Sequence, residues 1–287
     1  YPDAFTESQG KCGYVAVVNH FTHPLRAAEP LLHAAWRRGE ESGNLTYATY
    51  AINTLARWSL LSGSPLGELI SDCDRYLAAV ALMNHAAGYE ALRLIRQVAR
   101  ALRGETDGPL LLRSSDFDQD KCLKVLTEMQ MRVQVYFHNN FRALLCLIFG
   151  DPLAGLQHCD ANRSDADSVL LGLLDLVEFY HLEALLIAQA LPMLGGLRRV
   201  RLRRRLQHNA KALARWAQHA PRNFQHRWLM VRAEQAWLAG RRDEAIHDLT
   251  AAVRLARDEH FLRDEAIALE RMATLLRARQ LTEVADL

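Results

Sequence analysis

Apolar residues at helical spacing constrain this chain more than any other feature of its sequence. In the stretch RRDEAIHDLTAAVRLARDEHF, residues 241–261, the apolar positions recur at intervals of four, three and four residues: Ala245, Leu249, Ala252 and Ala256. These intervals place the four side chains on one face of a helix with 3.6 residues per turn. The stretch therefore predicts an amphipathic helix that buries this face against other helices.

Similar spacing recurs along almost the whole chain, and glycine and proline fall between the periodic segments. No stretch alternates apolar and polar residues between hairpin turns, so strands are not expected. Half of the residues are hydrophobic, which is enough for a large core. The chain is therefore predicted to be all-α. The predicted helices are 25–41, 45–61, 66–83, 85–103, 118–128, 130–149, 152–161, 167–190, 198–219, 224–239, 242–258 and 264–279.

The last three of these helices are joined by very short turns. Gly240 can take the left-handed conformation that ends a helix, and Asp264 is a predicted N-cap of the following one. Asp243 and Glu244 fall in the first turn of the helix between them, where acidic side chains favour the helix dipole. Helices joined in this way are expected to pack antiparallel to their neighbours.

Helical pairs with glycine turns recur at intervals of about 35–45 residues. The stretch AWLAGRRDEAIHDLTAAVRLA, residues 236–256, has the closing glycine and small alanines of a tetratricopeptide unit, and residues 40–77 and 144–159 repeat the theme. This pattern predicts antiparallel helical hairpins stacked as a tetratricopeptide-like α-solenoid, in which each pair packs against its neighbours. Residues 1–287 are predicted to form a single domain, with soft divisions near 104–117 and 191–197.

The stretch APRNFQHRWLMVRAEQAWLAG, residues 220–240, contains His, Asn, Arg and Trp in close succession and could indicate a reactive site. Pro221 cannot continue a preceding helix, and Asn223 is predicted to cap the next one. The two tryptophans are interpreted as packing anchors, and His226 as structural or exposed. The stretch is therefore predicted to be the start of a helix.

Charge and cysteine content exclude several classes of protein. The formal net charge is +2, too small for a global field that attracts nucleic acid. Five scattered cysteines without a CxxC pair are interpreted as reduced core thiols of a cytoplasmic protein. No apolar run approaches the roughly 20 residues of a membrane span, so no membrane partner is expected. No signal peptide is visible, although the chain begins at Tyr1 and this observation describes only the given piece.

Familiar catalytic and cofactor motifs are absent from the sequence. It has no GxxxxGK[ST] loop, no GxGxxG after a strand and no GxSxG elbow. His20 with His23, and His158 beside Cys159, lack a second pair of ligands at a suitable spacing for a metal. No catalytic, cofactor-binding or metal-binding residue is therefore assigned, and no cofactor is expected.

Two groups of acidic residues precede apolar helical segments. They are Asp116, Asp118 and Asp120, and Asp165 with Asp167. Alternating acids resemble part of a cation-binding loop, but the glycine and the distal glutamate of an EF-hand are missing. Helix capping and favourable dipole placement explain both groups more simply.

One basic cluster exceeds the background of this arginine-rich chain. It comprises six residues, Arg198, Arg199, Arg201, Arg203, Arg204 and Arg205, with Val200, Leu202 and Leu206 left for packing. The cluster is a candidate contact for a phosphate or an acidic partner. No aromatic residue interleaves with these arginines, which disfavours single-stranded nucleic acid. A solvated helix face is the simpler interpretation.

Several stretches in the same order resemble the helical-repeat region of large bacterial multidomain signalling proteins. The most specific are GNLTYATY (43–50), ALRGET (101–106) and APRNFQHR (220–227), and the resemblance covers nearly the whole chain but weakens in ERMATLLRARQLTEVADL. In that family a Ser/Thr-kinase-like domain and a STAND-type AAA ATPase precede the helical region, and a GAF domain and a histidine kinase often follow. No catalytic residue carries over, because catalysis in the family resides in those other domains.

The resemblance implies a non-catalytic module that regulates an adjacent ATPase or kinase. Its expected partners are those domains or another signalling protein, with a small-molecule inducer as a further possibility. Two alternatives remain open at the level of sequence. One is a stand-alone metal-dependent enzyme that uses Asp116, Asp118 and Asp120, and the other is a nucleic-acid-binding protein that uses the arginines at 198–205.

Overall fold

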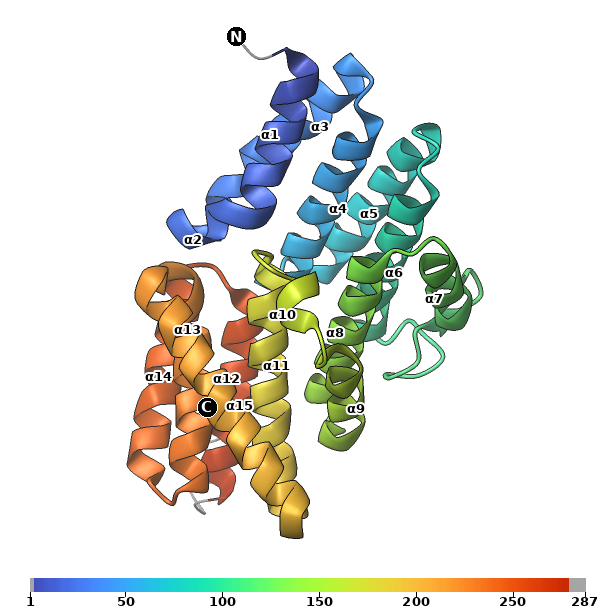
Figure 1. Ribbon diagram of the computed structural model, residues 1–287. Helices are drawn as coiled ribbons and strands as arrows, with labels where there is room; N and C mark the ends of the chain where they lie inside the picture. Colours follow the sequence, from blue (N-terminus) through green and yellow to red (C-terminus); the bar gives the residue numbers. More distant parts are fainter. Residues whose placement is uncertain (1–2, 279–287) are drawn as a thin grey trace.

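The computed structural model describes residues 3–278 and is all-helical apart from one short hairpin (Figure 1). Residues 4–22, for which the sequence predicted no helix, begin with α1 (Ala4–Tyr14) and continue through a π-helical turn (Val15–Asn19) into α2 (His20–Thr22). The side chain of Asp3 caps α1 by accepting a hydrogen bond from Thr6 N at 2.8 Å. Polar and apolar residues are mixed in this segment, so its helical period is not apparent in the sequence.

The remaining helices follow the predicted order. They are a 3-10 turn (Leu25–Ala28), α3 (Glu29–Ser42), α4 (Leu45–Ser62), α5 (Leu66–Leu82), α6 (Ala86–Leu102), α7 (Gln119–Glu128), α8 (Arg132–Ile148), α9 (Pro152–Asn162), α10 (Ala166–Val169), α11 (Leu174–Ala190), a 3-10 turn (Leu191–Met193), α12 (Gly196–His219), α13 (Pro221–Leu238), α14 (Arg242–Asp258) and α15 (Leu262–Ala278). The two strands are β1 (Arg113–Ser114) and β2 (Phe117–Asp118), paired antiparallel.

Most predicted helices differ from the structure by a few residues at their ends, and three of these differences concern the site regions. The predicted helix 167–190 is divided into α10 and α11, because Gly172 adopts a φ of +77° between them. α13 begins at Pro221 rather than at 224, since proline needs no N–H donor in the first turn of a helix. α15 begins at Leu262 rather than at 264, and residue 279, its predicted end, lies outside the described residues.

Most consecutive helices pack against one another along the chain, from α3 with α4 to α14 with α15, whereas α9 packs against α11 and the short α10 against α8. The predicted apolar stripe of α14 is confirmed, because Ala245, Leu249, Ala252 and Ala256 are all buried. Gly43, Gly63 and Gly240 close their helices with positive φ angles, as the sequence predicted. Local signals therefore locate most of the helical pairs correctly.

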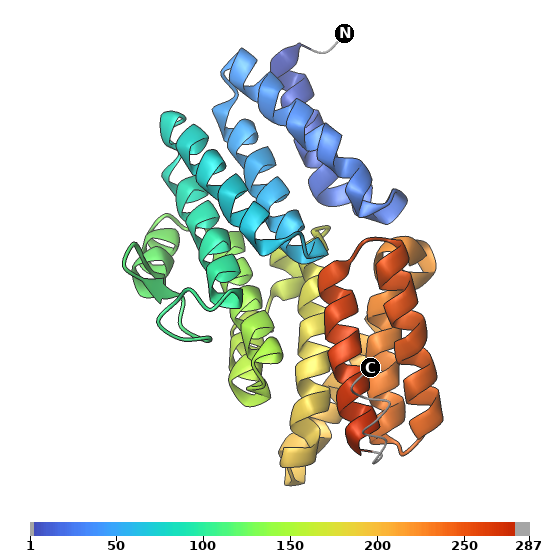
Figure 2. The same ribbon diagram turned by 180° about the vertical axis from the view of Figure 1, so that it is seen from behind.

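Contacts between distant segments add a second level of organisation. The segment around α2 lies against α13, and the end of α4 lies against the start of α15, as Figures 1 and 2 show from opposite sides. An array in which each helical pair contacts only its neighbours would not bring these segments together. The N-terminal helices thus contact the C-terminal ones directly.

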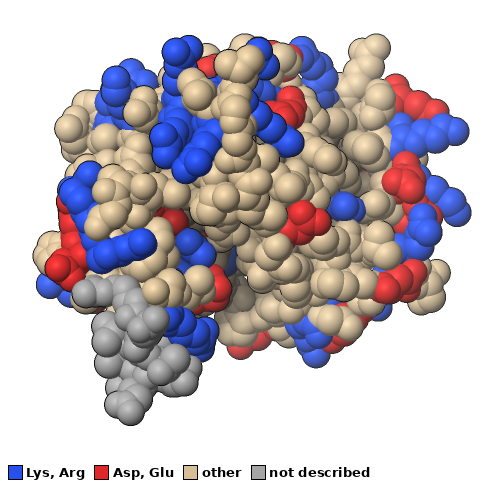
Figure 3. Space-filling view, turned by 90° about the horizontal axis from the view of Figure 1, so that it is seen from below, with Lys and Arg blue, Asp and Glu red and all other residues tan. Residues whose placement is uncertain are grey.

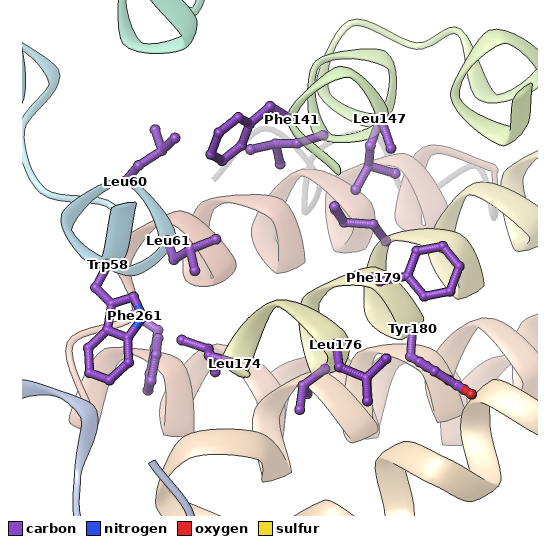
Figure 4. Close-up of a cluster of buried hydrophobic side chains, with 14 of the residues drawn as sticks. Trp58, Leu60, Leu61, Phe141, Leu147, Leu174, Leu176, Phe179, Tyr180 and Phe261 are labelled. Atoms are coloured by element: carbon purple, nitrogen blue, oxygen red, sulfur yellow. The ribbon is translucent and has the colours of Figure 1, made fainter. Parts of the chain in front are cut away.

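Buried apolar side chains from all parts of the fold form one cluster that extends from Cys12 to Leu275. Figure 4 shows a part of it, where Trp58 and Leu61 of α4 lie near Leu174 of α11 and near Phe261, which follows α14. α11 is buried along almost its whole length, which makes it the central helix of this core. No helix within residues 3–278 is long and apolar enough to cross a membrane.

Gly63 lies where the end of α4 meets the start of α15. It has a φ of +86°, and a Cβ atom there would lie 2.2 Å from the backbone nitrogen of Arg263. We expect Gly63→Ala to lower the free energy of unfolding by the cost of a left-handed alanine, about 1 to 2 kcal/mol, plus an overpacking cost of about 1 to 3 kcal/mol. Urea denaturation followed by circular dichroism measures this loss.

Gly43→Ala is the matched control for this substitution. Gly43 has a similar φ of +74°, but an added Cβ would meet open space. The free energy of unfolding of the control should therefore fall only by the cost of holding an alanine in the left-handed conformation, about 1 to 2 kcal/mol. Equal losses in the two variants would contradict a close contact between α4 and α15.

Candidate functional site

The first acidic group lies at the hairpin before α7, and its carboxylates are occupied by polar partners. Asp118 is confirmed as the N-cap of α7, since it accepts hydrogen bonds from the backbone N–H groups of Asp120 and Lys121. Asp116 instead binds Arg96 at 2.7 Å and Arg100 at 2.8 Å, so its role is not capping. A hydrogen bond from Ser114, aided by these arginines, lowers the pKa of Asp116 to about 2. These contacts connect the hairpin to α6.

The second acidic group does not cap a helix with its side chains. Asp165 precedes α10 but makes no side-chain cap, and its carboxylate accepts hydrogen bonds from Tyr136 and Arg132 of α8. Asp167 accepts a hydrogen bond of 2.8 Å from the hydroxyl of Tyr180. The capping prediction was therefore wrong for this group, because partners on other helices bind both carboxylates.

Histidines and cysteines are dispersed in the fold. All five cysteines are buried and unpaired, as predicted from their spacing. His20 is fully buried, whereas His23 is exposed and lies beside Tyr14 and Thr22. In the part of the chain that the structure describes, no three His, Cys, Asp or Glu side chains are arranged to hold a metal ion.

The stretch at 220–240 forms α13 and is largely buried. Asn223 does not cap the helix, because the helix starts earlier. Its side chain instead donates to the carbonyl groups of His20 and His23 at 2.7 Å each and accepts from the N–H of Leu25 at 3.0 Å. Trp228 and Trp237 pack against the core, in agreement with their predicted role. Asn223 therefore joins α13 to the N-terminal segment.

His226 and Arg227 of α13 belong to a fully buried ionic cluster with two residues of α15 and one of α11. Arg227 Nε donates to Asp264 Oδ2 at 2.7 Å, and His226 Nε2 lies 2.9 Å from the same oxygen. Arg263 binds Glu178 at 2.8 Å and Asp264 at 2.8 Å. The predicted capping role of Asp264 was wrong, because its carboxylate is drawn to these two guanidinium groups instead of to backbone N–H groups.

The electrostatics of this cluster favour its ionised form. Burial alone raises the pKa of Asp264, but the guanidinium groups of Arg227 and Arg263 outweigh burial and hold this pKa well below its usual range. The same balance lowers the pKa of Glu178. The cluster is closed to solvent and holds α11, α13 and α15 together, which is a structural role.

The arginines predicted as an anionic contact lie along the start of α12 and divide into two groups. Arg205 turns inward, where it binds Asp160 at 2.7 Å and also the buried carboxylate of Glu183. Five arginines are exposed and make no ion pair with any described residue: Arg198, Arg199, Arg201, Arg203 and Arg204. Val200, predicted to pack, is exposed, whereas Leu202 and Leu206 are buried.

This surface also presents apolar side chains. Met193, Leu197 and Val200 are exposed close to the arginines in sequence. α12 begins at the lower end of the molecule in Figure 1. Figure 3 shows this end from below, with basic side chains gathered along the upper edge of the view. We call Leu197, Val200 and the five exposed arginines the basic face of α12, although they spread around all sides of the helix except the one buried by Leu202 and Leu206. Its composition suits an acidic partner with some apolar surface.

A cavity of about 490 Å³ opens between α1, α4, α6 and the start of α8. Its walls are mostly apolar and include Leu94, Ile95 and Phe141. The polar side chains at the cavity come mainly from α4, where Asn53 and Arg57 lie one helical turn apart. A cavity of this size and character is typical of small-molecule sites.

Arg57 is 94% buried at the wall of the cavity, since its relative exposure is 6%. Its guanidinium stacks over the ring of Phe137 at 4.1 Å from the ring centre, and its Nη1 lies 3.2 Å from a carboxylate oxygen of Asp175 on α11. No motif of the sequence predicted Arg57 or the cavity as a site. The available signal was a charged residue within the largely apolar segment INTLARWSLL, residues 52–61.

Three places in the described structure gather several of these residues: the basic face of α12, the buried ionic cluster and the cavity. The structure does not bring the acidic group at 116–120 together with any of the three. Comparison of the chain with protein-family models, with curated proteins and with solved structures gives no match.

Proposed function

We propose that this chain is a non-catalytic binding and regulatory module of a bacterial signal-transduction ATPase or kinase. In this proposal its helical pairs form a tetratricopeptide-like array whose first and last helices also contact each other, and the array binds an adjacent domain on its surface and an inducer in its cavity. The observation that carries the proposal is the open, mostly apolar cavity in a chain whose buried acids are bound to arginines.

A physical route from the cavity to the rest of the fold supports a regulatory role. Arg57 contacts both the cavity and Asp175, and Asp175 stands in the first turn of α11. One helical turn further along α11, Glu178 joins the ionic cluster that holds α13 and α15. A ligand that favours one arrangement of these helices would shift their equilibrium by its difference in affinity for the two arrangements.

The basic face of α12 is the proposed contact for the partner domain. Its five exposed arginines are free to form bidentate contacts with carboxylates, and Leu197 can contribute apolar area at 76% exposure. A nucleic-acid backbone offers similar anionic contacts, so nucleic acid is the second candidate for this face. The absence of interleaved aromatic residues favours the protein partner.

We expect the chain to bind the ATPase or kinase domain of the same signalling protein with a micromolar dissociation constant, which calorimetric titration measures. The triple substitution Arg199→Ser, Arg203→Ser and Arg204→Ser should weaken binding at least about tenfold at low salt, since each removes a charge from the contact. Arg254→Ser, at an exposed arginine of α14, is the matched control and should leave the affinity unchanged.

Two results would contradict this proposal. One is the absence of binding to both domains at micromolar concentrations. The other is tighter binding to duplex DNA than to either domain, with an affinity that falls steeply as salt rises, which would favour the nucleic-acid candidate.

A further inference from the structure

We propose that the cavity between α1, α4, α6 and the start of α8 binds an uncharged molecule with a body of about three aromatic rings. This inference names the class of the inducer, and it rests on the proposed function only in treating the cavity as a ligand site. It involves no residue of the basic face of α12. Failure of one proposal therefore leaves the other intact.

The charged side chains at the cavity already have partners within the chain. Arg57 Nη1 lies 3.2 Å from a carboxylate oxygen of Asp175, and Arg132 pairs with Asp165. Among the described residues, these two arginines are the only charged ones that line the cavity. An ionised ligand would lose its hydration there without gaining a counter-ion from the protein, which is costly. The site therefore favours an uncharged ligand.

The polar side chains that α4 contributes to the cavity are engaged with the backbone. The amide nitrogen of Asn53 donates to the carbonyl groups of Thr49 at 3.0 Å and of Gly88 at 3.2 Å. The hydroxyl of Thr54 donates to the carbonyl of Tyr50 at 2.8 Å. Because these donors are already used, they offer no further hydrogen bonds to a ligand. The affinity must therefore come mainly from apolar contact.

Aromatic side chains line the cavity from two helices. Tyr47 and Tyr50 of α4 stand edge to face with ring centres 5.7 Å apart, and α8 contributes Phe137 and Phe141. Aromatic rings gain energy from stacked and edge-to-face contacts beyond the area that they bury. A rigid ring system also loses less conformational entropy on binding than a flexible alkyl chain does. These walls therefore favour a ligand with flat aromatic rings.

The volume of the cavity sets the size of the ligand. Leu94 and Ile95 of α6, Val133 of α8 and Leu173 add further apolar surface to its walls. An apolar cavity of about 150 Å³ holds one benzene molecule. The volume of about 490 Å³ therefore accommodates a body of about three rings. Removal of these rings from water supplies the affinity.

A matched pair of dyes tests this inference on the full chain. N-phenyl-1-naphthylamine is uncharged and has three aromatic rings, whereas 1-anilinonaphthalene-8-sulfonate has the same rings and an added sulfonate. We expect the uncharged dye to bind at one site with a micromolar dissociation constant. The sulfonate dye should bind that site at least about tenfold more weakly, because its charge would be buried without a partner. The fluorescence of each dye measures its titration.

Substitutions at the walls locate the bound dye. Ala91→Phe on α6 and Ala16→Phe in the π-helical turn after α1 fill the cavity from two different elements. Each should weaken binding of the uncharged dye at least about tenfold, because the added ring occupies the space of the ligand. Ala78→Phe, at an exposed position of α5 that does not line the cavity, is the matched control and should bind normally. Circular dichroism spectra show which variants fold.

The inference is overturned if the uncharged dye does not bind saturably, or if the folded wall variants bind it as tightly as the unmodified chain. Equal or tighter binding of the sulfonate dye at the site that these variants block would overturn the choice of an uncharged ligand. Tighter binding of 1-decanol than of the uncharged dye in a calorimetric titration would overturn the choice of an aromatic body. Titrations with the ATPase and kinase domains test the proposed function separately.

Discussion

Replacement of Asp264 with alanine is expected to lower the free energy of unfolding by about 3 to 5 kcal/mol. The substitution would leave Arg227 and Arg263 buried with Glu178 as their only acidic partner in the cluster. An uncompensated charge in the core is far more costly than the loss of an exposed ion pair. Urea denaturation at neutral pH, followed by circular dichroism, measures this change.

Two further variants separate charge from shape at this position. Asp264→Asn keeps the size of the side chain and removes its charge, so its loss of stability should approach that of the alanine variant. Asp258→Ala, at an exposed position near the end of α14, should change stability by less than about 0.5 kcal/mol. If Asp264→Asn were as stable as the unmodified chain, the ionic account of the cluster would be wrong.

Acidification from pH 7 to pH 5 is the second change for which we expect a large effect. Burial lowers the pKa of His20 and of His138 to about 4, and that of His181 to about 3, from an ordinary value of 6.5. Below pH 6.5 these histidines take up protons in the unfolded chain but remain neutral in the folded one. The contribution of these neutral histidines to the free energy of unfolding is therefore fully present above pH 6.5, and it is lost as the pH decreases towards their pKa values in the folded chain.

The expected loss is about 2 kcal/mol for each of these histidines between pH 6.5 and pH 5. Carboxylates with lowered pKa values, such as Asp116 and Asp264, lose their contribution to the free energy of unfolding only below pH 3.8, the ordinary pKa of an aspartate. They therefore do not mask the loss of stability that the histidines cause between pH 6.5 and pH 5. Urea denaturation at several pH values within this window gives the slope of stability against pH.

His181→Gln tests the assignment because it removes one titrating group from the centre of α11. The slope of stability against pH should decrease by no more than about one quarter, whatever the effect on stability at pH 7, since burial also lowers the pKa of His158 to about 4 and lowers the pKa of His226. His219→Gln, at an exposed position near the end of α12, should leave the slope unchanged. A flat profile between pH 7 and pH 5 in the unmodified chain would contradict neutral burial of these side chains.

The candidate sites differ in how far the sequence could predict them. The basic face of α12 depends on neighbouring residues of one helix, so the sequence located its five arginines. The inward turn of Arg205 and the exposure of Val200 required the tertiary structure, because they depend on where Glu183 and the other helices lie. The cavity depends on four helices that are far apart in the chain, and no local pattern indicates that Asn53 and Val133 line the same cavity. Its residues were missed for that reason.

The sequence by itself determined the helical class, most helix ranges and the glycine turns, because hydrogen bonding within a helix and a positive φ at glycine depend on residues close together in the chain. Only the tertiary structure decided the roles of individual polar residues. Asn223 joins His20 across 203 positions rather than capping its own helix, and Asp264 binds Arg227 across 37. A buried polar group binds whichever partner the packing brings within about 3 Å, and that partner can lie anywhere in the chain.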